Sequence, residues 1–134
     1  MFLFDVNFLA IIVVVVVNLL LGAIWYSPYL FGPAWTKAHL FNVSDLKPTP
    51  FHYIGAAIVA FITAWVFSLI INWTEAITIA EGAFLGFFLW LGFVATTHFS
   101  GVLWAKKNII AYLIDSGYQL VSLILMGILL TAWF

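Results

Sequence analysis

Cysteine and arginine are both absent from the 134 residues of this chain. Without cysteine there is no disulfide, no thiolate metal site and no cysteine nucleophile. Charged residues make up only 7% of the chain, compared with roughly 25% in ordinary soluble domains. The formal net charge is −1, so the chain lacks the general basic surface that binds nucleic acid. These shortages exclude a water-soluble domain and give no support to nucleic acid as a partner.

Hydrophobic residues, in contrast, make up 66% of the chain. A helix of about 20 apolar residues, rising 1.5 Å per residue, crosses the roughly 30 Å hydrocarbon core of a bilayer. Four stretches have this length, at 8–26, 53–71, 79–99 and 109–133. We therefore predict an all-α polytopic membrane protein in which 1–134 is a single transmembrane domain. The first stretch is expected to stay as a helix, because no lysine precedes it and no small-residue cleavage site follows it.

The lysines predict how the four helices are oriented. Lys37 and Lys47 lie between the first and second spans, and Lys106 and Lys107 lie between the third and fourth. Loops rich in lysine stay on the cytoplasmic side of a membrane. The prediction is that both of these loops are cytoplasmic and that both termini are outside.

An aromatic stretch follows the first span. Its Ser-Pro step ends the first helix, and its Gly-Pro step begins a short interfacial helix at 33–41. Trp25, Tyr26 and Trp35 are typical of an aromatic belt at a membrane surface, and Lys37 and His39 are polar. One interpretation is anchoring in the headgroup layer. The other is that Lys37 and His39 bind anionic lipid headgroups.

Polar residues inside the predicted spans form the candidate site, because such residues are costly in a bilayer. His98 near the end of the third span and Asp115 two turns into the fourth reach similar depth in an antiparallel hairpin. The candidate cluster consists of His98, Asp115, Tyr118, Gln119, Thr97 and Asn18. One interpretation is a route for a proton, ion or small solute. The other is a hydrogen-bonded cluster that joins two helices, with Lys106 or Lys107 reaching the carboxylate.

A second polar layer is predicted near the middle of the bilayer. Counting from the span ends places Asn18, Trp65, Trp90 and Ser122 at nearly the same depth. An indole N–H far from the interface needs an acceptor. We expect Asn18 or Ser122 to supply it, and the alternative is a constriction in a transport pathway.

Thr78 and Glu81 mark the start of the third helix. Their Thr-x-x-Glu spacing is that of a capping box, which satisfies two backbone amides at a helix N-terminus. The alternative is that Glu81 from several copies forms a ring that attracts cations at the outer mouth of an oligomer.

Small residues predict where helices pack closely. Ala56, Ala60 and Ala64 recur every four positions in the second span, and Gly82 and Gly86 form a Gly-x-x-x-Gly motif in the third. These seams pack helices within one chain or between copies. We expect a homo-oligomer embedded in the lipid bilayer.

Enzymatic and metal chemistry find little support. The three histidines lack the spacing of a zinc site, and no nucleotide-binding or calcium-binding motif is present. Ser100 lies only two residues beyond His98, so the two side chains do not face each other on one helix. No metal, no cofactor and no enzymatic activity are expected.

Three segments together resemble one protein family. They read GAIWYSPYLFGPAW at 22–35, ATTHFSGVLW at 95–104 and AYLIDSGYQLVSLILMGILL at 111–130. They are similar to DUF1761, a family of uncharacterised bacterial integral membrane proteins. The resemblance implies four helices in a bacterial cytoplasmic membrane, and it implies no activity and no site residue.

Two functions remain open from the sequence. The first is a small oligomeric transporter or channel for a proton, ion or small solute. The second is a structural or accessory membrane subunit without transport activity. A path for water that reaches Asn18 from the side of Asp115 favours the first, and a dry, fully paired interior favours the second.

Overall fold

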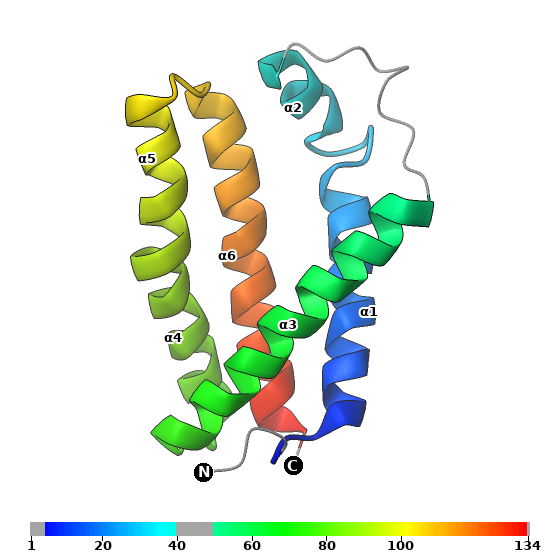
Figure 1. The fold of residues 1–134 in the computed structure, drawn as a ribbon, viewed down its shortest axis with the longest axis vertical. Helices are drawn as coiled ribbons and strands as arrows, with labels where there is room; N and C mark the ends of the chain where they lie inside the picture. Colours follow the sequence, from blue (N-terminus) through cyan, green and yellow to red (C-terminus); the bar gives the residue numbers. More distant parts are fainter. Residues whose placement is uncertain (1–4, 40–49, 134) are drawn as a thin grey trace.

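The computed structural model describes residues 5–39 and 50–133, and these are organised as a bundle of helices (Figure 1). A π-helical segment, Trp90–Ala95, joins α4 to α5, so that the two form one continuous helix. The α-helices are α1 (Phe8–Trp25), α2 (Gly32–His39), α3 (Pro50–Thr74), α4 (Ile79–Leu89), α5 (Thr96–Trp104) and α6 (Ile109–Ala132).

Four helical stretches are long and apolar enough to cross a membrane, which confirms that part of the predicted fold. The third stretch ends at Trp104 rather than at residue 99. Residues 100–104 keep their helical hydrogen bonds until Lys106, whose φ of 53° ends the helix. The interfacial helix spans Gly32–His39, and positions 40 and 41 of the predicted segment lie outside the described residues.

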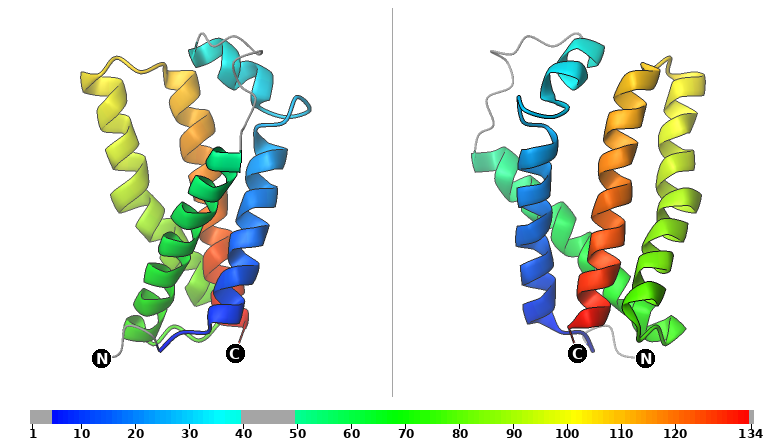
Figure 2. Two further views of the ribbon diagram at one scale, coloured as in Figure 1. Left: turned by 45° about the vertical axis from the view of Figure 1, so that its right-hand side comes forward. Right: turned by 180° about the vertical axis from the view of Figure 1, so that it is seen from behind.

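The helices run antiparallel, so that the described chain begins and ends at one end of the bundle (Figure 1). We call this the termini end. The opposite end carries α2 and the turn from α5 to α6 (Figure 2), with Lys37, Lys106 and Lys107. We call it the lysine end; Lys47 lies outside the described residues. Between the two ends, α3 crosses the bundle obliquely (Figure 1).

The core lies where α3 crosses α1 and α6 (Figure 1). Its most deeply buried side chains are contributed by α1 and α3, with Met126 of α6 packed against them. We call this group the apolar seal, and it consists of Ile11, Val14, Ala64, Phe67 and Met126. Each of these side chains is at most 3% exposed, so the middle of the three-helix contact is closed.

Glycines bring α4 and α6 together near the termini end. A Cβ atom added at Gly82 would collide with the backbone of Gly127, and one added at Gly86 would collide with the backbone of Leu123. The Gly82 and Gly86 seam is therefore occupied within the chain, which leaves it unavailable for contacts between copies. Ala60 and Ala64 of the other seam are buried as well.

The start of α4 confirms the predicted capping box. The Thr78 hydroxyl accepts from the Glu81 amide at 3.1 Å, and a Glu81 carboxylate oxygen accepts from the Thr78 amide at 3.3 Å. Two amides at the helix N-terminus are satisfied in this way. The Glu81 carboxylate thus has a structural partner at the helix start.

Candidate functional site

A cavity of about 890 Å³ opens between α1, α2, α3 and α6. We call it the central cavity. It extends from Trp35 and Thr36 of α2 at the lysine end to Met126, which belongs to the apolar seal. The polar side chains that line it are Asn18, Tyr26, Trp35, Thr36, His52, Tyr53, Thr63, Tyr118, Gln119 and Ser122. Three members of the predicted cluster, Asn18, Tyr118 and Gln119, are thus brought together on its wall.

Asn18 and Ser122 form the deepest polar contact of the cavity wall. The Ser122 hydroxyl donates a hydrogen bond to the Asn18 side-chain oxygen, and the Tyr118 hydroxyl donates to the Asn18 backbone oxygen at 3.2 Å. Gln119 differs, because its amide makes no hydrogen bond within the described part of the chain. The cavity therefore presents one amide that is free to bind a solute.

Tyr26 connects the cavity to a carboxylate. Its hydroxyl donates to Asp115 Oδ1 at 2.6 Å. Tyr26 follows the last residue of α1, and burial, together with this hydrogen bond, raises the pKa of its phenol above the usual value. The phenol therefore stays protonated near neutral pH and remains a donor to Asp115. The ring of Tyr26 also contacts Trp35, with ring centroids 5.3 Å apart.

The structure does not join Asp115 to His98. Asp115 contacts Tyr26 on the side of α1, whereas His98 is exposed on α5, and among the described residues no hydrogen bond links the two side chains. Thr97 is exposed, and its hydroxyl donates to the Phe93 carbonyl at 2.7 Å, within its own helix. The cavity thus includes neither His98 nor Thr97.

The predicted indole acceptors differ from those found. The Trp90 indole donates to the Ser116 backbone oxygen at 2.8 Å instead of to Asn18 or Ser122. A backbone carbonyl of α6 lies in reach because the π-helical segment contacts α6, and sequence depth alone does not reveal such a contact. Trp65, the other predicted member of this layer, packs against the hydrophobic core.

The aromatic residues at the lysine end divide into two groups. Trp25 points into the protein, where its indole donates to the Ile114 carbonyl at 3.0 Å. Tyr29 and Trp104 point outward and are 94% and 85% exposed. Tyr29 and Trp104 therefore present their rings to a membrane surface, and Trp25 joins α1 to α6.

The α2 helix packs on the protein as well as facing outward. It contacts α6, Trp35 is half-buried and Thr36 is buried, while Lys37 is exposed. The buried Thr36 hydroxyl donates to the Gly32 carbonyl at 2.7 Å and needs no water. The side chain of His39 lies outside the described set.

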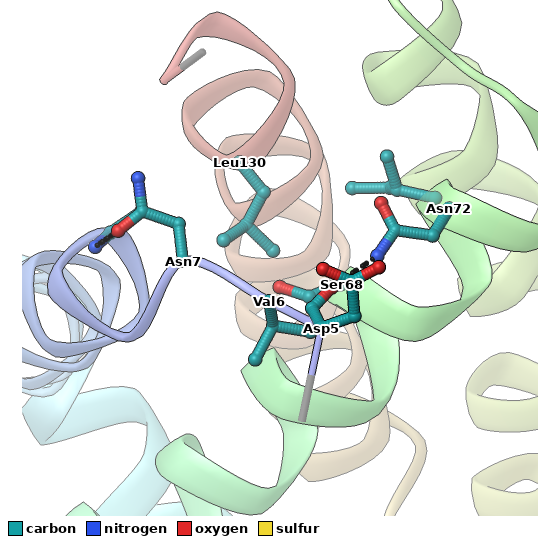
Figure 3. A pocket seen from close by; sticks show the side chains of 8 residues that line it. Asp5, Val6, Asn7, Ser68, Asn72 and Leu130 are labelled. Atoms are coloured by element: carbon teal, nitrogen blue, oxygen red, sulfur yellow. Dashed lines mark hydrogen bonds between the residues drawn. The ribbon is translucent and has the colours of Figure 1, made fainter. Parts of the chain in front are cut away.

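A smaller hollow of about 300 Å³ lies at the termini end. It is formed by α1, α3 and α6 and by the segment before α1. Figure 3 shows Asp5, Ser68 and Asn72 gathered on one side of it and Asn7 on the other. The Asn72 amide donates to the Asp5 backbone oxygen at 2.8 Å. The apolar seal lies between this hollow and the central cavity.

Comparison with known proteins identifies the family. The model of a family described as "Protein of unknown function (DUF1761)" matches residues 9–131. The chain belongs to the DUF1761 family. It matches no curated protein and no solved structure. Within the described ranges of this DUF1761 member, no three His, Cys, Asp or Glu side chains are grouped in a way that could hold a metal ion.

Several cavity residues of this DUF1761 protein escaped the sequence analysis. His52, Tyr53 and Thr63 of α3 line the cavity, and Tyr26 is the partner of Asp115. One signal was present for Tyr26, since its Trp-Tyr-Ser-Pro segment is part of the family resemblance. No signal in the sequence marks Thr63, because its neighbours are apolar on every side of the helix.

Proposed function

We propose that this protein spans a lipid bilayer with four helices and transports a small solute through the bundle. The central cavity is the binding site, and it opens to the cytoplasm at the lysine end. The apolar seal closes the route towards the outer side, where both termini lie. Association of several copies remains a prediction, since Gly82 and Gly86 are already used within the chain.

A single observation supports this proposal over the accessory one. The central cavity reaches Asn18 in the middle of α1 from the end where Asp115 lies, and the Gln119 amide on its wall has no hydrogen-bond partner in the described residues. A polar group without a partner in a bilayer is expensive. A cavity of this volume, lined by apolar side chains together with polar groups, is the usual form of a small-molecule site.

The lysine distribution supports the orientation. Lys37, Lys106 and Lys107 are all exposed at the end where the cavity opens. Lysine-bearing loops stay in the cytoplasm, so the cavity faces inward in this conformation. A transporter then needs a second conformation in which the seal opens and the hollow near Asp5 meets the cavity.

The absence of native cysteine allows a direct test. Thr63→Cys and Gln119→Cys place a thiol in the cavity, and Phe67→Cys places one in the seal. A membrane-impermeant thiol reagent added to inside-out vesicles should label the two cavity thiols and spare Phe67→Cys. Lys107→Cys and Glu75→Cys serve as controls that react only from the inner and the outer face.

The transport proposal also predicts how the same variants react from the outer face. A carrier that opens in turn to both faces should let Gln119→Cys react also from the outer face, more slowly than from the inner one. If the cavity thiols react from neither face, the interior is dry and the protein is an accessory subunit. If they react only from the inner face, the cavity binds a solute without transporting it.

A further inference from the structure

The central cavity is rich in aromatic rings near its opening. Tyr26, Trp35, Tyr53 and Tyr118 all line it. Tyr26 stands at the centre of this group, because its ring centroid lies 5.3 Å from that of Trp35 and 5.5 Å from that of Tyr118. The face of an aromatic ring is negative and attracts cations, most strongly where water is excluded.

Charge near the cavity favours the same kind of ligand. The Tyr26 hydroxyl donates to the Asp115 carboxylate at 2.6 Å, which increases the electron density of the ring that faces the cavity. Lys37, Lys106 and Lys107 are exposed and do not line the cavity. Among its described lining residues, His52 is the one side chain that can become positive.

The far end of the path has a matching character. The hollow at the termini end is lined by the Asp5 carboxylate and by the amides of Asn7 and Asn72 (Figure 3). No lysine is among its described lining residues. A carboxylate thus lies near each end of the path, Asp115 behind Tyr26 and Asp5 beside the hollow.

We propose that the solute is an organic cation with an aromatic or apolar body, held against the rings of Tyr26, Trp35 and Tyr118. This inference rests on the proposed transport function, because it names the solute of that site. Binding of the solute can be tested separately from its transport. No carboxylate is among the described lining residues, so the wall lacks the set of charged oxygen ligands that an inorganic cation requires. An anion would meet no lysine among the described lining residues.

The test compares small aromatic probes of different charge. Purified protein in lipid nanodiscs is titrated calorimetrically with benzyltrimethylammonium, with benzenesulfonate and with benzyl alcohol. We expect the cation to bind at least about ten-fold more tightly than the anion or the neutral probe, a difference of about 1.4 kcal/mol that a desolvated cation–π contact can supply.

Variants assign the binding to the proposed rings. Tyr26→Leu removes the ring and should abolish the preference for the cation. Tyr26→Phe keeps the ring and loses only the bond to Asp115, and Asp115→Asn removes the charge. Both should weaken cation binding several-fold and leave benzyl alcohol unaffected. Tyr29→Leu is the matched control, because Tyr29 is 94% exposed and lies outside the cavity.

Each outcome decides one claim. Equal binding of benzyltrimethylammonium and benzenesulfonate, or a cation preference that persists in Tyr26→Leu, overturns the inference about the ligand. The thiol labelling of the cavity is unaffected by that result, so the transport proposal stands or falls separately. If the cation binds as expected but does not cross the membrane of proteoliposomes, the ligand class holds and the transport function is wrong.

Discussion

Near the termini end, α4 and α6 approach until glycine backbones touch, whereas near the lysine end long aromatic side chains hold the helices apart. Gly82, Gly86 and Gly127 leave no room for a Cβ atom in the first region. In the second region, Trp25 and Tyr112 reach across to backbone carbonyls at 3.0 and 3.1 Å. The same α6 helix takes part in both kinds of contact.

The difference shows that α6 meets its neighbours at two spacings. Close backbone approach maximises dispersion contacts and leaves no void. An aromatic side chain that donates to a carbonyl sets a longer distance between helices, and the space beside it remains open. Each indole or phenol bond also fixes the rotation of one helix against the next. Near the lysine end α6 is therefore held at a distance from its neighbours by specific side-chain contacts, and near the termini end its contact with α4 is closed by packing.

The largest effect is expected from a substitution that breaks the close contact between α4 and α6. Gly127→Leu introduces a side chain where a Cβ already collides with the Gly82 carbonyl and contacts Phe67. Overpacking on this scale costs about 3 kcal/mol or more, because the two backbones must separate. The free energy of unfolding, measured by denaturant titration in micelles, should fall by at least that amount.

Gly55→Leu is the matched control for this prediction. Gly55 also lies in a long apolar helix, but a Cβ atom there meets nothing within 4 Å. Its leucine variant should unfold with the free energy of the native chain. A similar loss of stability in both variants would mean that glycine matters for the helix itself and that close approach is not the cause.

A smaller effect is expected from the aromatic side chains that donate to backbone carbonyls of a neighbouring helix. Trp90→Phe keeps an aromatic ring and removes the indole bond to the Ser116 carbonyl. One interhelical hydrogen bond in a membrane contributes about 1 kcal/mol, so the free energy of unfolding should decrease by about that amount. Trp104→Phe is the control, because Trp104 is 85% exposed. Equal stability of both variants would show that the Trp90 bond does not hold the helices.

Hydropathy predicted the four long helices because each one is apolar over its whole length. The same property hides the rotation of each helix, since a helix that is apolar all round has no face that marks the inside. Counting residues from the span ends placed Asp115 at the depth of His98. The rotation of α6 about its own axis instead directs the Asp115 side chain towards Tyr26, at the end of α1. The candidate site was thus predicted in part, through Asn18, Tyr118 and Gln119, and not through His98 or Thr97.

A motif within a few consecutive residues is easier to predict from the sequence than a contact between two helices. The capping box of Thr78 and Glu81 is contained in four consecutive residues, so the sequence was sufficient to predict it. The Gly82 and Gly86 motif predicts close packing without naming the partner helix, and the partner proved to be α6. The π-helical segment Trp90–Ala95 leaves no pattern in the sequence, because it depends on how that helix fits against α6.

The smallest expected effect separates two amides on the same cavity wall. The Asn18 side-chain oxygen accepts from Ser122, so Asn18→Leu leaves that hydroxyl without its acceptor and should cost about 1 kcal/mol of unfolding free energy. Gln119 has no hydrogen-bond partner in the described chain, so Gln119→Leu should change stability by less than about 0.5 kcal/mol.

For Gln119, ligand binding should depend on the amide and the stability of the fold should not. An amide that contributes nothing to the fold and lines a cavity is available to a ligand, so Gln119→Leu should weaken the binding of benzyltrimethylammonium while the unfolding curve stays unchanged. Leucine fills a similar volume and lacks only the polar group, so the comparison measures the attraction of the amide dipole for the cation. If Gln119→Leu destabilises the protein as much as Asn18→Leu does, the amide belongs to the packing. The lysine end would then be closed in the same sense as the termini end, and the contrast between the two regions would fail.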